Sequence, residues 1–235
     1  MSRTAPSLLL LCLLCLPCLA ACAGEDGAAP SSPQDGDRPD PSAASIPRPA
    51  AFAFACGELA LVAMPEDDVV QIRMPDRALT LPQVPAASGA KYERDEASFW
   101  NKGDEATLVL DGREYACRLV PDPFTEARGR GIVFRALGQE PGWVLDLEPA
   151  TGLHLVYDYG EQEATVPFTV PVVGPGRTRI ESGNGRDEIA VVIEPRFCAD
   201  AMSGAPFPTT VTVTVNGRTL QGCGARLVPG APPGL

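Results

Sequence analysis

Two long stretches of the chain alternate between apolar and polar residues, which is the pattern of β-strands that bury one face. In the first stretch, alternate positions are apolar across residues 59–63, 70–74 and 108–110. Asp111-Gly112 lies between two such runs, where this dipeptide favours a tight hairpin turn. Because few segments are long and periodic enough for a helix, the pattern predicts an all-β fold.

A second alternating stretch runs from about residue 132 to residue 228. Within it, Asn184-Gly185 and Asn216-Gly217 predict tight turns. Residues 121–131 contain prolines and glycines and separate the two stretches. We therefore expect two folded domains, residues 52–121 and residues 129–229. The clearest strands of the second domain are expected at residues 143–147, 153–159, 188–193, 209–215 and 219–223.

The first residues of the chain resemble a bacterial secretion signal. Arg3 precedes a short apolar run at residues 8–16, too short to span a bilayer comfortably. The sequence Leu19-Ala20-Ala21-Cys22 resembles the processing box of bacterial lipoproteins. We expect a signal peptide at residues 1–21 and lipidation of Cys22, which would anchor the chain in a membrane. The alternative is an ordinary signal that is cleaved elsewhere and leaves a soluble periplasmic protein.

The segment after Cys22 is polar and acidic. Residues 22–51 are rich in Pro, Ala, Ser, Asp and Gly, a composition that predicts a disordered linker. Cys22 is followed directly by Ala23 and Gly24, without the aspartate that retains lipoproteins in the inner membrane, which favours sorting to the outer membrane on its periplasmic side. The formal net charge of −11 and the absence of a basic patch argue against nucleic acid as a partner.

The chain has eight cysteines, of which three lie within the expected signal peptide and one is Cys22. An exported protein with four remaining cysteines predicts two disulfides. We favour local pairing, because each pair then brackets a stretch with its own strands. On the loop-entropy model these bridges contribute roughly 4 and roughly 3.5 kcal/mol. Zinc is the alternative, but no C-x-x-C spacing or neighbouring histidine supports it. The predicted bridges are Cys56–Cys117 and Cys198–Cys223.

Two short polar loops in the first domain carry the candidate chemistry. One offers Ser88 and the other Lys102, and neither has a base or metal ligand nearby in the sequence. A nucleophilic serine needs a base, yet the single histidine, His154, belongs to a predicted strand of the second domain. We therefore expect loops that fill the cleft of another protein, with no enzymatic activity, metal or cofactor.

Four features of the first domain occur together in one order. They are Leu79-Thr80-Leu81-Pro82, Ser88-Gly89-x-x-Tyr92, Phe99-Trp100-x-Lys102-Gly103-Asp104-Glu105-Ala106, and the flanking cysteines. In this order and spacing, the segment resembles the MliC family, the membrane-bound inhibitors of c-type lysozyme. The resemblance covers residues 56–117 and implies a small antiparallel β-barrel whose two loops enter the lysozyme cleft. The resemblance also implies that c-type lysozyme is the binding partner.

The resemblance also implies roles for individual residues. Ser88 and Lys102 would enter the cleft, where lysozyme holds one protonated and one ionised carboxyl group. Gly89 and Gly103 would let the loop backbones approach closely or adopt positive φ, while Tyr92 braces the loops or adds contact area, as Trp100 does. Apart from the resemblance, acidic residues flank these loops in the sequence and could form a rim around the lysine, or could simply be the acidic turns of an acidic protein. This rim would comprise Glu93, Asp95, Glu96, Asp104 and Glu105.

The second domain resembles regions of uncharacterised bacterial envelope lipoproteins and carries a less informative set of polar residues. Glu140, Asp200, Ser203 and Arg218 could form a polar site, but we favour turn capping around the disulfide. Two further hypotheses stand beside lysozyme inhibition. One is a structural or sensing envelope lipoprotein without tight lysozyme binding, and the other is an envelope hydrolase whose site lies in the second domain.

Overall fold

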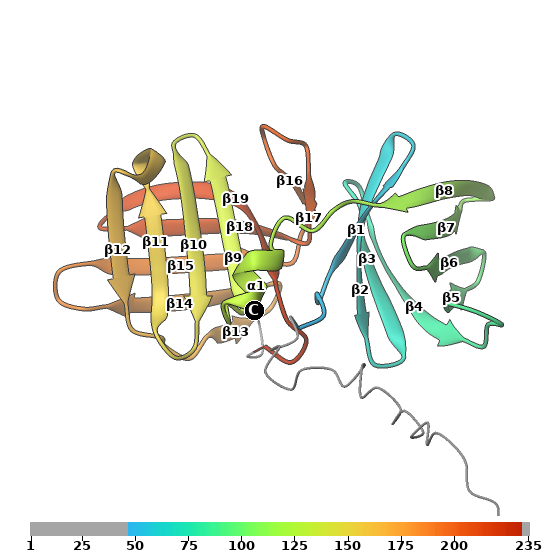
Figure 1. Ribbon diagram of the computed structural model, residues 1–235, viewed down its shortest axis with the longest axis horizontal. Coiled ribbons are helices and arrows are strands. Elements are labelled where there is room, and N and C mark those ends of the chain that lie inside the picture. The colour runs from blue at the N-terminus through green and yellow to red at the C-terminus, as the bar shows by residue number, and fades with distance from the viewer. Residues whose placement is uncertain (1–46, 232–235) are drawn as a thin grey trace, which may run out of the picture. The chain divides into compact units, whose positions relative to one another are not determined.

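The computed structural model describes residues 47–231, which belong to one compact unit spanning Ala44–Leu235. The predicted signal peptide, the predicted lipidation site Cys22 and linker residues 22–46 lie outside the described residues. Within residues 47–231, no helix is long and apolar enough to cross a membrane. The described chain is almost entirely β-structure, as the alternating pattern predicts, and forms two successive sheets (Figure 1).

The first sheet is a closed antiparallel barrel in which each strand pairs with the next along the chain. It closes where the first and last strands pair, with Phe54 opposite Leu119 and Ala55 opposite Arg118. This confirms the small antiparallel barrel. Its strands are β1 (Phe52–Cys56), β2 (Leu59–Glu66), β3 (Val69–Arg73), β4 (Ala78–Val84), β5 (Ala90–Arg94), β6 (Ala97–Lys102), β7 (Glu105–Leu110) and β8 (Arg113–Leu119).

The apolar positions of the alternating pattern form the barrel core. Leu61, Ile72 and Leu108 are fully buried inside it, together with Phe54, whose ring meets that of Phe99 edge to face. The predicted hairpin at Asp111-Gly112 joins β7 to β8, and both residues have positive φ, as a type I′ turn requires. Local sequence therefore specifies both the inward face and the turn.

The disulfide Cys56–Cys117 forms as predicted and lies at the seam of the barrel. Cys56 ends β1, and Cys117 precedes Arg118, the β8 residue opposite Ala55. The bridge thus connects the two strands whose pairing closes the sheet, although 61 residues separate them in sequence.

The second sheet has nine antiparallel strands in the order β12-β11-β10-β9-β19-β18-β15-β14-β13. A two-stranded ribbon and two short helices accompany it. The elements are α1 (Thr125–Gly129), β9 (Phe134–Gln139), β10 (Gly142–Glu148), β11 (Gly152–Tyr157), η1 (Asp158–Gly160), β12 (Gln162–Val166), β13 (Val172–Gly174), β14 (Arg177–Gly183), β15 (Glu188–Glu194), β16 (Cys198–Ala199), β17 (Pro206–Phe207), β18 (Thr209–Val215) and β19 (Arg218–Arg226).

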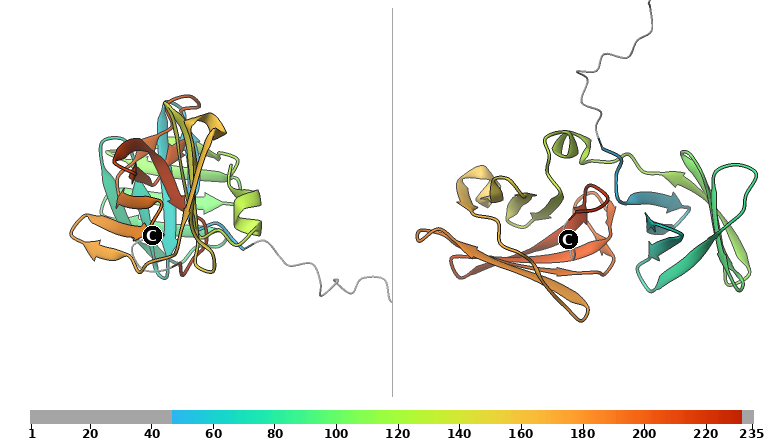
Figure 2. Two further views of the ribbon diagram at one scale, coloured as in Figure 1. Left: turned by 90° about the vertical axis from the view of Figure 1, so that its left-hand side faces the viewer. Right: turned by 90° about the horizontal axis from the view of Figure 1, so that it is seen from below.

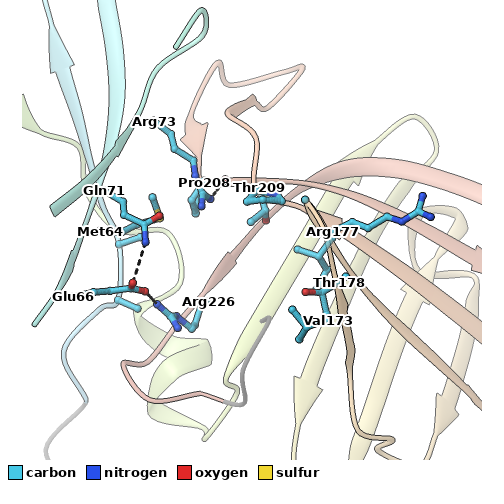
Figure 3. A pocket seen from close by; sticks show the side chains of 16 residues that line it. Met64, Glu66, Gln71, Arg73, Val173, Arg177, Thr178, Pro208, Thr209 and Arg226 are labelled. Atoms are coloured by element: carbon cyan, nitrogen blue, oxygen red, sulfur yellow. Dashed lines mark hydrogen bonds and ion pairs between the residues drawn. The ribbon is translucent and has the colours of Figure 1, made fainter. Parts of the chain in front are cut away.

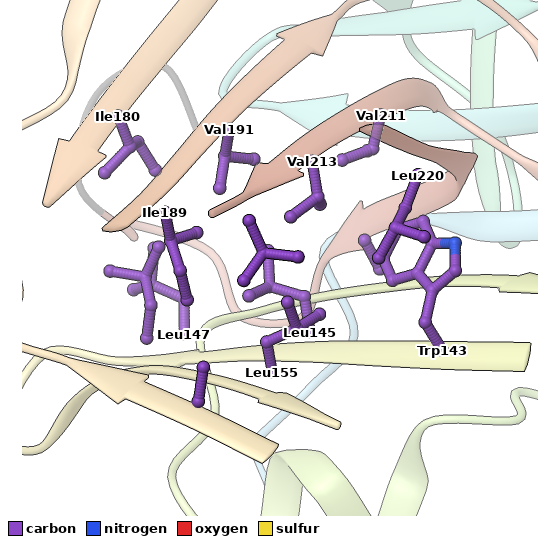
Figure 4. Close-up of a cluster of buried hydrophobic side chains, with 14 of the residues drawn as sticks. Trp143, Leu145, Leu147, Leu155, Ile180, Ile189, Val191, Val211, Val213 and Leu220 are labelled. Atoms are coloured by element: carbon purple, nitrogen blue, oxygen red, sulfur yellow. The ribbon is translucent and has the colours of Figure 1, made fainter. Parts of the chain in front are cut away.

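This sheet curls so that one half faces the other across a single apolar core (Figures 2 and 4). Leu145 and Leu155 come from one half, and Val191 and Val213 from the other. In β18 the valines point inward while the threonines alternate with them, a direct consequence of the two-residue strand period.

The predicted strands of the second domain are found, with one difference at the end of β11. The expected strand 153–159 stops at Tyr157, because Asp158 and Tyr159 have φ of 53° and 59° and turn the chain. The turn signals Asn184-Gly185 and Asn216-Gly217 lie between β14 and β15 and between β18 and β19. The disulfide Cys198–Cys223 also forms as predicted and ties β16 to β19.

Close packing accounts for several glycines of the second sheet. A Cβ on Gly138 would lie 2.2 Å from the indole nitrogen of Trp143, and one on Gly222 would lie 1.9 Å from the carbonyl oxygen of Leu137. The buried indole of Trp143 donates to the carbonyl of Gln221 at 3.2 Å. These glycines therefore let the tryptophan and the strand backbones approach one another.

The short helix α1 between the two sheets is not predicted by the sequence pattern. With five residues it is too short to show helical periodicity. Its buried Arg128 forms an ion pair with Asp122 and donates to the carbonyl of Pro47 at 2.6 Å. Ala127 and Phe124 pack in a small cluster with Phe207.

Candidate functional site

Strand pairing brings the two predicted loops together at one end of the barrel. Strands β5 and β6 pair so that Ala90 lies opposite Asn101. Ser88 and Gly89 directly precede β5, and Lys102 ends β6, so the two loops are neighbours. Ser88 and Lys102 are both exposed. The structure therefore assembles the predicted serine and lysine on one edge.

The two glycines act differently. Gly89 has φ of 68°, and a Cβ there would lie 2.2 Å from the carbonyl oxygen of Asn101 and 3.0 Å from Cγ of Lys102. Gly103 also has positive φ, but nothing crowds it. It is the first central residue of the hairpin between Lys102 and Glu105, where a type II′ turn places glycine. Gly89 thus permits close approach of the loops, whereas Gly103 permits the turn.

The indole of Trp100 contacts both loops. Its Nε1 donates to the carbonyl oxygen of Ser88 at 2.9 Å. The ammonium nitrogen of Lys102 lies 3.4 Å from the centre of its ring, a cation–π contact. One half-exposed side chain therefore fixes the serine backbone and restricts the lysine.

The lysine and the serine retain unused hydrogen-bonding capacity. Within residues 47–231, Lys102 forms no ion pair and the hydroxyl of Ser88 makes no hydrogen bond to protein. The nearby Glu105 instead approaches Arg118 at 3.5 Å. The site thus presents a cation and a hydroxyl to solvent, with no base positioned to activate either.

The prediction of an acidic rim around Lys102 is wrong for two of its residues. Asp95 and Glu96 form the turn between β5 and β6, whereas Ser88 and Lys102 lie at the other end of these strands. Asp104 and Glu105 do flank Lys102. Strand direction explains the difference, because residues near in sequence to a loop end up on the opposite rim after one strand.

Tyr92 lies in the barrel core and is only 5% exposed. Burial raises the pKa of its phenol. Its strand position opposite Phe99 holds β5 against β6, so it braces the site from inside.

Sequence reasoning missed Asn101, whose side-chain amide donates to the carbonyl of Gly103 at 3.0 Å and supports the Lys102 hairpin. The sequence signal that could have indicated this role is the position of a polar residue directly before the Lys102-Gly103 turn.

The four polar candidates of the second domain occupy separate structural positions. Asp200 is 6% exposed and accepts hydrogen bonds from the hydroxyl of Ser203 at 2.6 Å and from the amide of Gln139 at 2.7 Å. Burial opposes its ionisation, but these hydrogen bonds outweigh burial and lower the pKa of Asp200. Asp200 and Ser203 therefore cap the turn between β16 and β17.

The other polar candidates bind different partners at strand ends. Glu140 accepts a hydrogen bond from the hydroxyl of Tyr159, and Arg218 pairs with Asp158 at 2.5 Å. His154 lies in β11, as predicted, with its ring Nδ1 3.0 Å from the hydroxyl of Thr165.

Comparison with known proteins identifies a family whose pattern matches the barrel. Residues 54–116 match the family described as membrane-bound lysozyme-inhibitor of c-type lysozyme (MliC). The chain is also similar to the membrane-bound lysozyme inhibitor of C-type lysozyme of Yersinia enterocolitica. The two are 37% identical over 81 residues, which cover 33% of this chain and 69% of that protein. No solved structure gives a significant match.

Proposed function

Because this chain belongs to the MliC family of lysozyme inhibitors, we propose that it binds and inhibits c-type lysozyme. The observation that carries the proposal is the shared edge of the barrel, on which the Ser88 hydroxyl and the Lys102 ammonium are exposed and, among residues 47–231, form no hydrogen bond or ion pair with protein. A preorganised pair of this kind suits a cleft that contains carboxyl groups.

We propose that both side chains enter the lysozyme cleft. The ammonium of Lys102 offers three donors and a positive charge to the catalytic carboxylate. The hydroxyl of Ser88 can donate to an ionised carboxyl or accept from a protonated one. Exclusion of water from the cleft strengthens these charge-assisted hydrogen bonds. Trp100 acts as a positioning residue, since its indole contacts both loops.

The charge of the barrel supports encounter with a basic enzyme. Residues 52–121 contain 12 Asp or Glu and 7 Lys or Arg, a formal balance of 7 − 12 = −5. Opposite charges accelerate association, and salt screens the effect. Inhibition should therefore set in more slowly at high ionic strength, while the inserted pair is less affected.

We further propose that the protein is a lipoprotein of the cell envelope. In this proposal Cys22 carries the lipid, the anchor lies in the outer membrane on its periplasmic side, and residues 22–51 act as a tether. The inhibitor would then protect peptidoglycan from lysozyme.

The two-domain division at residues 52–121 and 129–229 is also a proposal, supported by separate sheets, separate cores and one disulfide in each region.

The test is inhibition of a c-type lysozyme by the mature protein and by Ser88→Ala and Lys102→Ala variants. We expect Lys102→Ala to raise the inhibition constant by about 10- to 100-fold, because a charge-assisted hydrogen bond is lost. Ser88→Ala should raise it by about 3- to 10-fold, the effect of a neutral hydrogen bond.

Lys91→Ala is the matched control. Lys91 is the other lysine of the chain, lies in β5 and pairs with Glu93 at 2.5 Å. The Lys91→Ala substitution should leave the inhibition constant unchanged, and thermal unfolding should show that all three variants fold. An unchanged inhibition constant in both loop variants would contradict the insertion mechanism, and no inhibition by the unaltered protein would contradict the function itself.

A further inference from the structure

A cleft of about 290 Å³ lies between the barrel and the second sheet, within the one compact unit of residues Ala44–Leu235 (Figure 3). Strands β2 and β3 form one wall, and strands β13, β14, β15 and β19 contribute to the other. The cleft is distinct from the Ser88 and Lys102 loops, none of whose residues line it. Its polar lining includes Arg73, Arg177 and Arg226 but only one acidic residue, Glu66.

Arg73 is the central feature of this cleft. It is half-buried, and its Nη1 donates to the carbonyl oxygen of Pro208 at 2.5 Å. Within the described part of the chain it forms no ion pair. A guanidinium carries five N–H donors in a planar fork, so one carbonyl leaves most of them available.

The acidic residue of the cleft is already engaged by other groups. Glu66 forms an ion pair with Arg226 and accepts a hydrogen bond from the amide of Gln71 at 3.0 Å. This pairing balances one positive charge against one negative charge and leaves the charge of Arg73 without a direct counterpart. Burial lowers the pKa of Arg73, Glu66 raises it and Arg226 lowers it, with burial the largest influence. An unmatched, partly desolvated cation is unfavourable unless an anion accompanies it.

The excess of positive charge is local to this cleft. The lining residues include three arginines and one glutamate, a formal balance of 3 − 1 = +2, in a chain whose formal net charge is −11. Arg177 is exposed beside the cleft at the start of β14 and also forms no ion pair among residues 47–231. Its guanidinium points away from Arg73 (Figure 3), so Arg177 adds only a longer-range positive field to the cleft.

The apolar part of the lining restricts the kind of anion. Met64 and Ile193 are buried in the lining, and Val173 is exposed on the side of the cleft opposite Met64 (Figure 3). A strongly hydrated inorganic ion gains nothing from such walls, whereas an anionic group on a small aliphatic carrier buries apolar surface there. A single unmatched guanidinium also suits a monovalent carboxylate, which it can bind through two parallel hydrogen bonds.

We propose that this cleft binds a carboxylate-bearing ligand of the kind presented by the free end of a small aliphatic peptide. The carboxylate binds the free donors of Arg73, and the aliphatic part contacts Met64 and Val173. Arg177 attracts the anion, while Arg226 and Glu66 hold the two sides of the cleft together. This binding is independent of lysozyme inhibition, because it uses a different set of residues.

Calorimetry and NMR on the mature protein would test this site. The probes are N-acetyl-alanyl-alanine, its C-terminal amide and inorganic phosphate. We expect saturable binding of the free acid with a shift of the Arg73 Nε–H resonance, and at least tenfold weaker binding of the amide and of phosphate. Arg73→Gln should weaken binding of the acid at least tenfold, and Arg73→Lys less, since it keeps the charge but loses the fork.

Three controls keep the result interpretable. Arg113→Gln, at an exposed position of β8, should bind the acid normally. Thermal unfolding should show that Arg73→Gln still folds. Lysozyme inhibition should survive Arg73→Gln, and peptide binding should survive Ser88→Ala and Lys102→Ala, which separates this proposal from the inhibitory function. Equal binding of the acid and the amide, stronger binding of phosphate, or unchanged binding in Arg73→Gln would each overturn the proposal, as would no binding of the acid.

Discussion

The barrel and the second sheet both contain sequence motifs, but the motif residues have opposite environments. In the barrel, Ser88 and Lys102 are exposed and have unused donors. In the second sheet, Trp143 and Asp200 are buried and hydrogen-bonded within the protein. A polar group that folding leaves unsatisfied at the surface is available for a partner, whereas one that folding satisfies stabilises the fold. Burial and hydrogen bonding thus separate the binding motif from the structural ones.

The two disulfides show the same contrast between the regions. Cys56–Cys117 joins the first and last strands of the closed barrel. Cys198–Cys223 joins the short strand β16 to β19, in an open sheet that does not depend on it for closure. The first bridge therefore stabilises the barrel that carries the Ser88 and Lys102 loops, whereas the second stabilises the short β16–β17 ribbon.

Removing the disulfides should have the largest effects. Replacing both Cys56 and Cys117 by serine should cost about 4 kcal/mol of unfolding free energy and abolish lysozyme inhibition, since the seam of the barrel loses its cross-link. The matched double replacement at Cys198 and Cys223 should cost about 3.5 kcal/mol and leave inhibition in place. Urea unfolding and inhibition assays would measure both. Inhibition that disappears equally in the two double variants would contradict the independence of the regions.

Gly222→Ala should strongly destabilise the second sheet. The added methyl would meet the Leu137 carbonyl oxygen at 1.9 Å and the Trp143 ring at 2.8 Å, so backbone must shift at a cost of about 3 kcal/mol. Gly174→Ala is the control, because its added methyl would meet nothing nearer than 3.7 Å. Chemical denaturation would compare them. Equal stability of the two variants would show that the close approach is unimportant.

Asp200→Ala should destabilise by about 1–3 kcal/mol at neutral pH, because Ser203 and Gln139 lose a buried acceptor. The pKa of Asp200 in the folded protein lies below its ordinary value of 3.8, so its stabilisation is complete well above that pH. It is lost as pH falls through the lowered pKa. The stability difference between the native protein and the variant should therefore shrink in acid, measured by thermal unfolding at several pH values. A difference that grows on acidification would contradict this sign.

The two tryptophans provide the finest comparison. Trp100→Phe keeps a ring beneath Lys102 but loses the hydrogen bond to the Ser88 carbonyl, so inhibition should weaken about 3- to 10-fold at a stability cost of about 1 kcal/mol. Trp143→Phe loses the analogous bond to the Gln221 carbonyl and should lower stability without changing inhibition. Paired inhibition constants and melting temperatures would separate the two roles. Similar inhibition by both variants would contradict the positioning role of Trp100.

Much of the local structure could be predicted from sequence. Alternation identified the inward residues of the strands, such as Leu61 and Ile72, and Asp111-Gly112 identified a hairpin. The loops that carry Ser88 and Lys102 were also identifiable, because glycines mark their turns. Both disulfides followed from local bracketing. These features depend on neighbours in sequence, and so a local pattern contains them.

The remaining features depend on which strands become neighbours in space. Placement of Asp95 and Glu96 on the far rim, burial of Tyr92 and the contact of Trp100 with Ser88 all follow from strand direction and register. By itself the sequence determined the β-class, the hairpins, the inward faces and the two exposed loops. The barrel was implied by the family resemblance and not by the local pattern. Only the tertiary structure decided the pairing of strands that closes it, the position of β9 beside β19 and the arginine cleft, because these arise from pairing and packing between residues far apart in the chain.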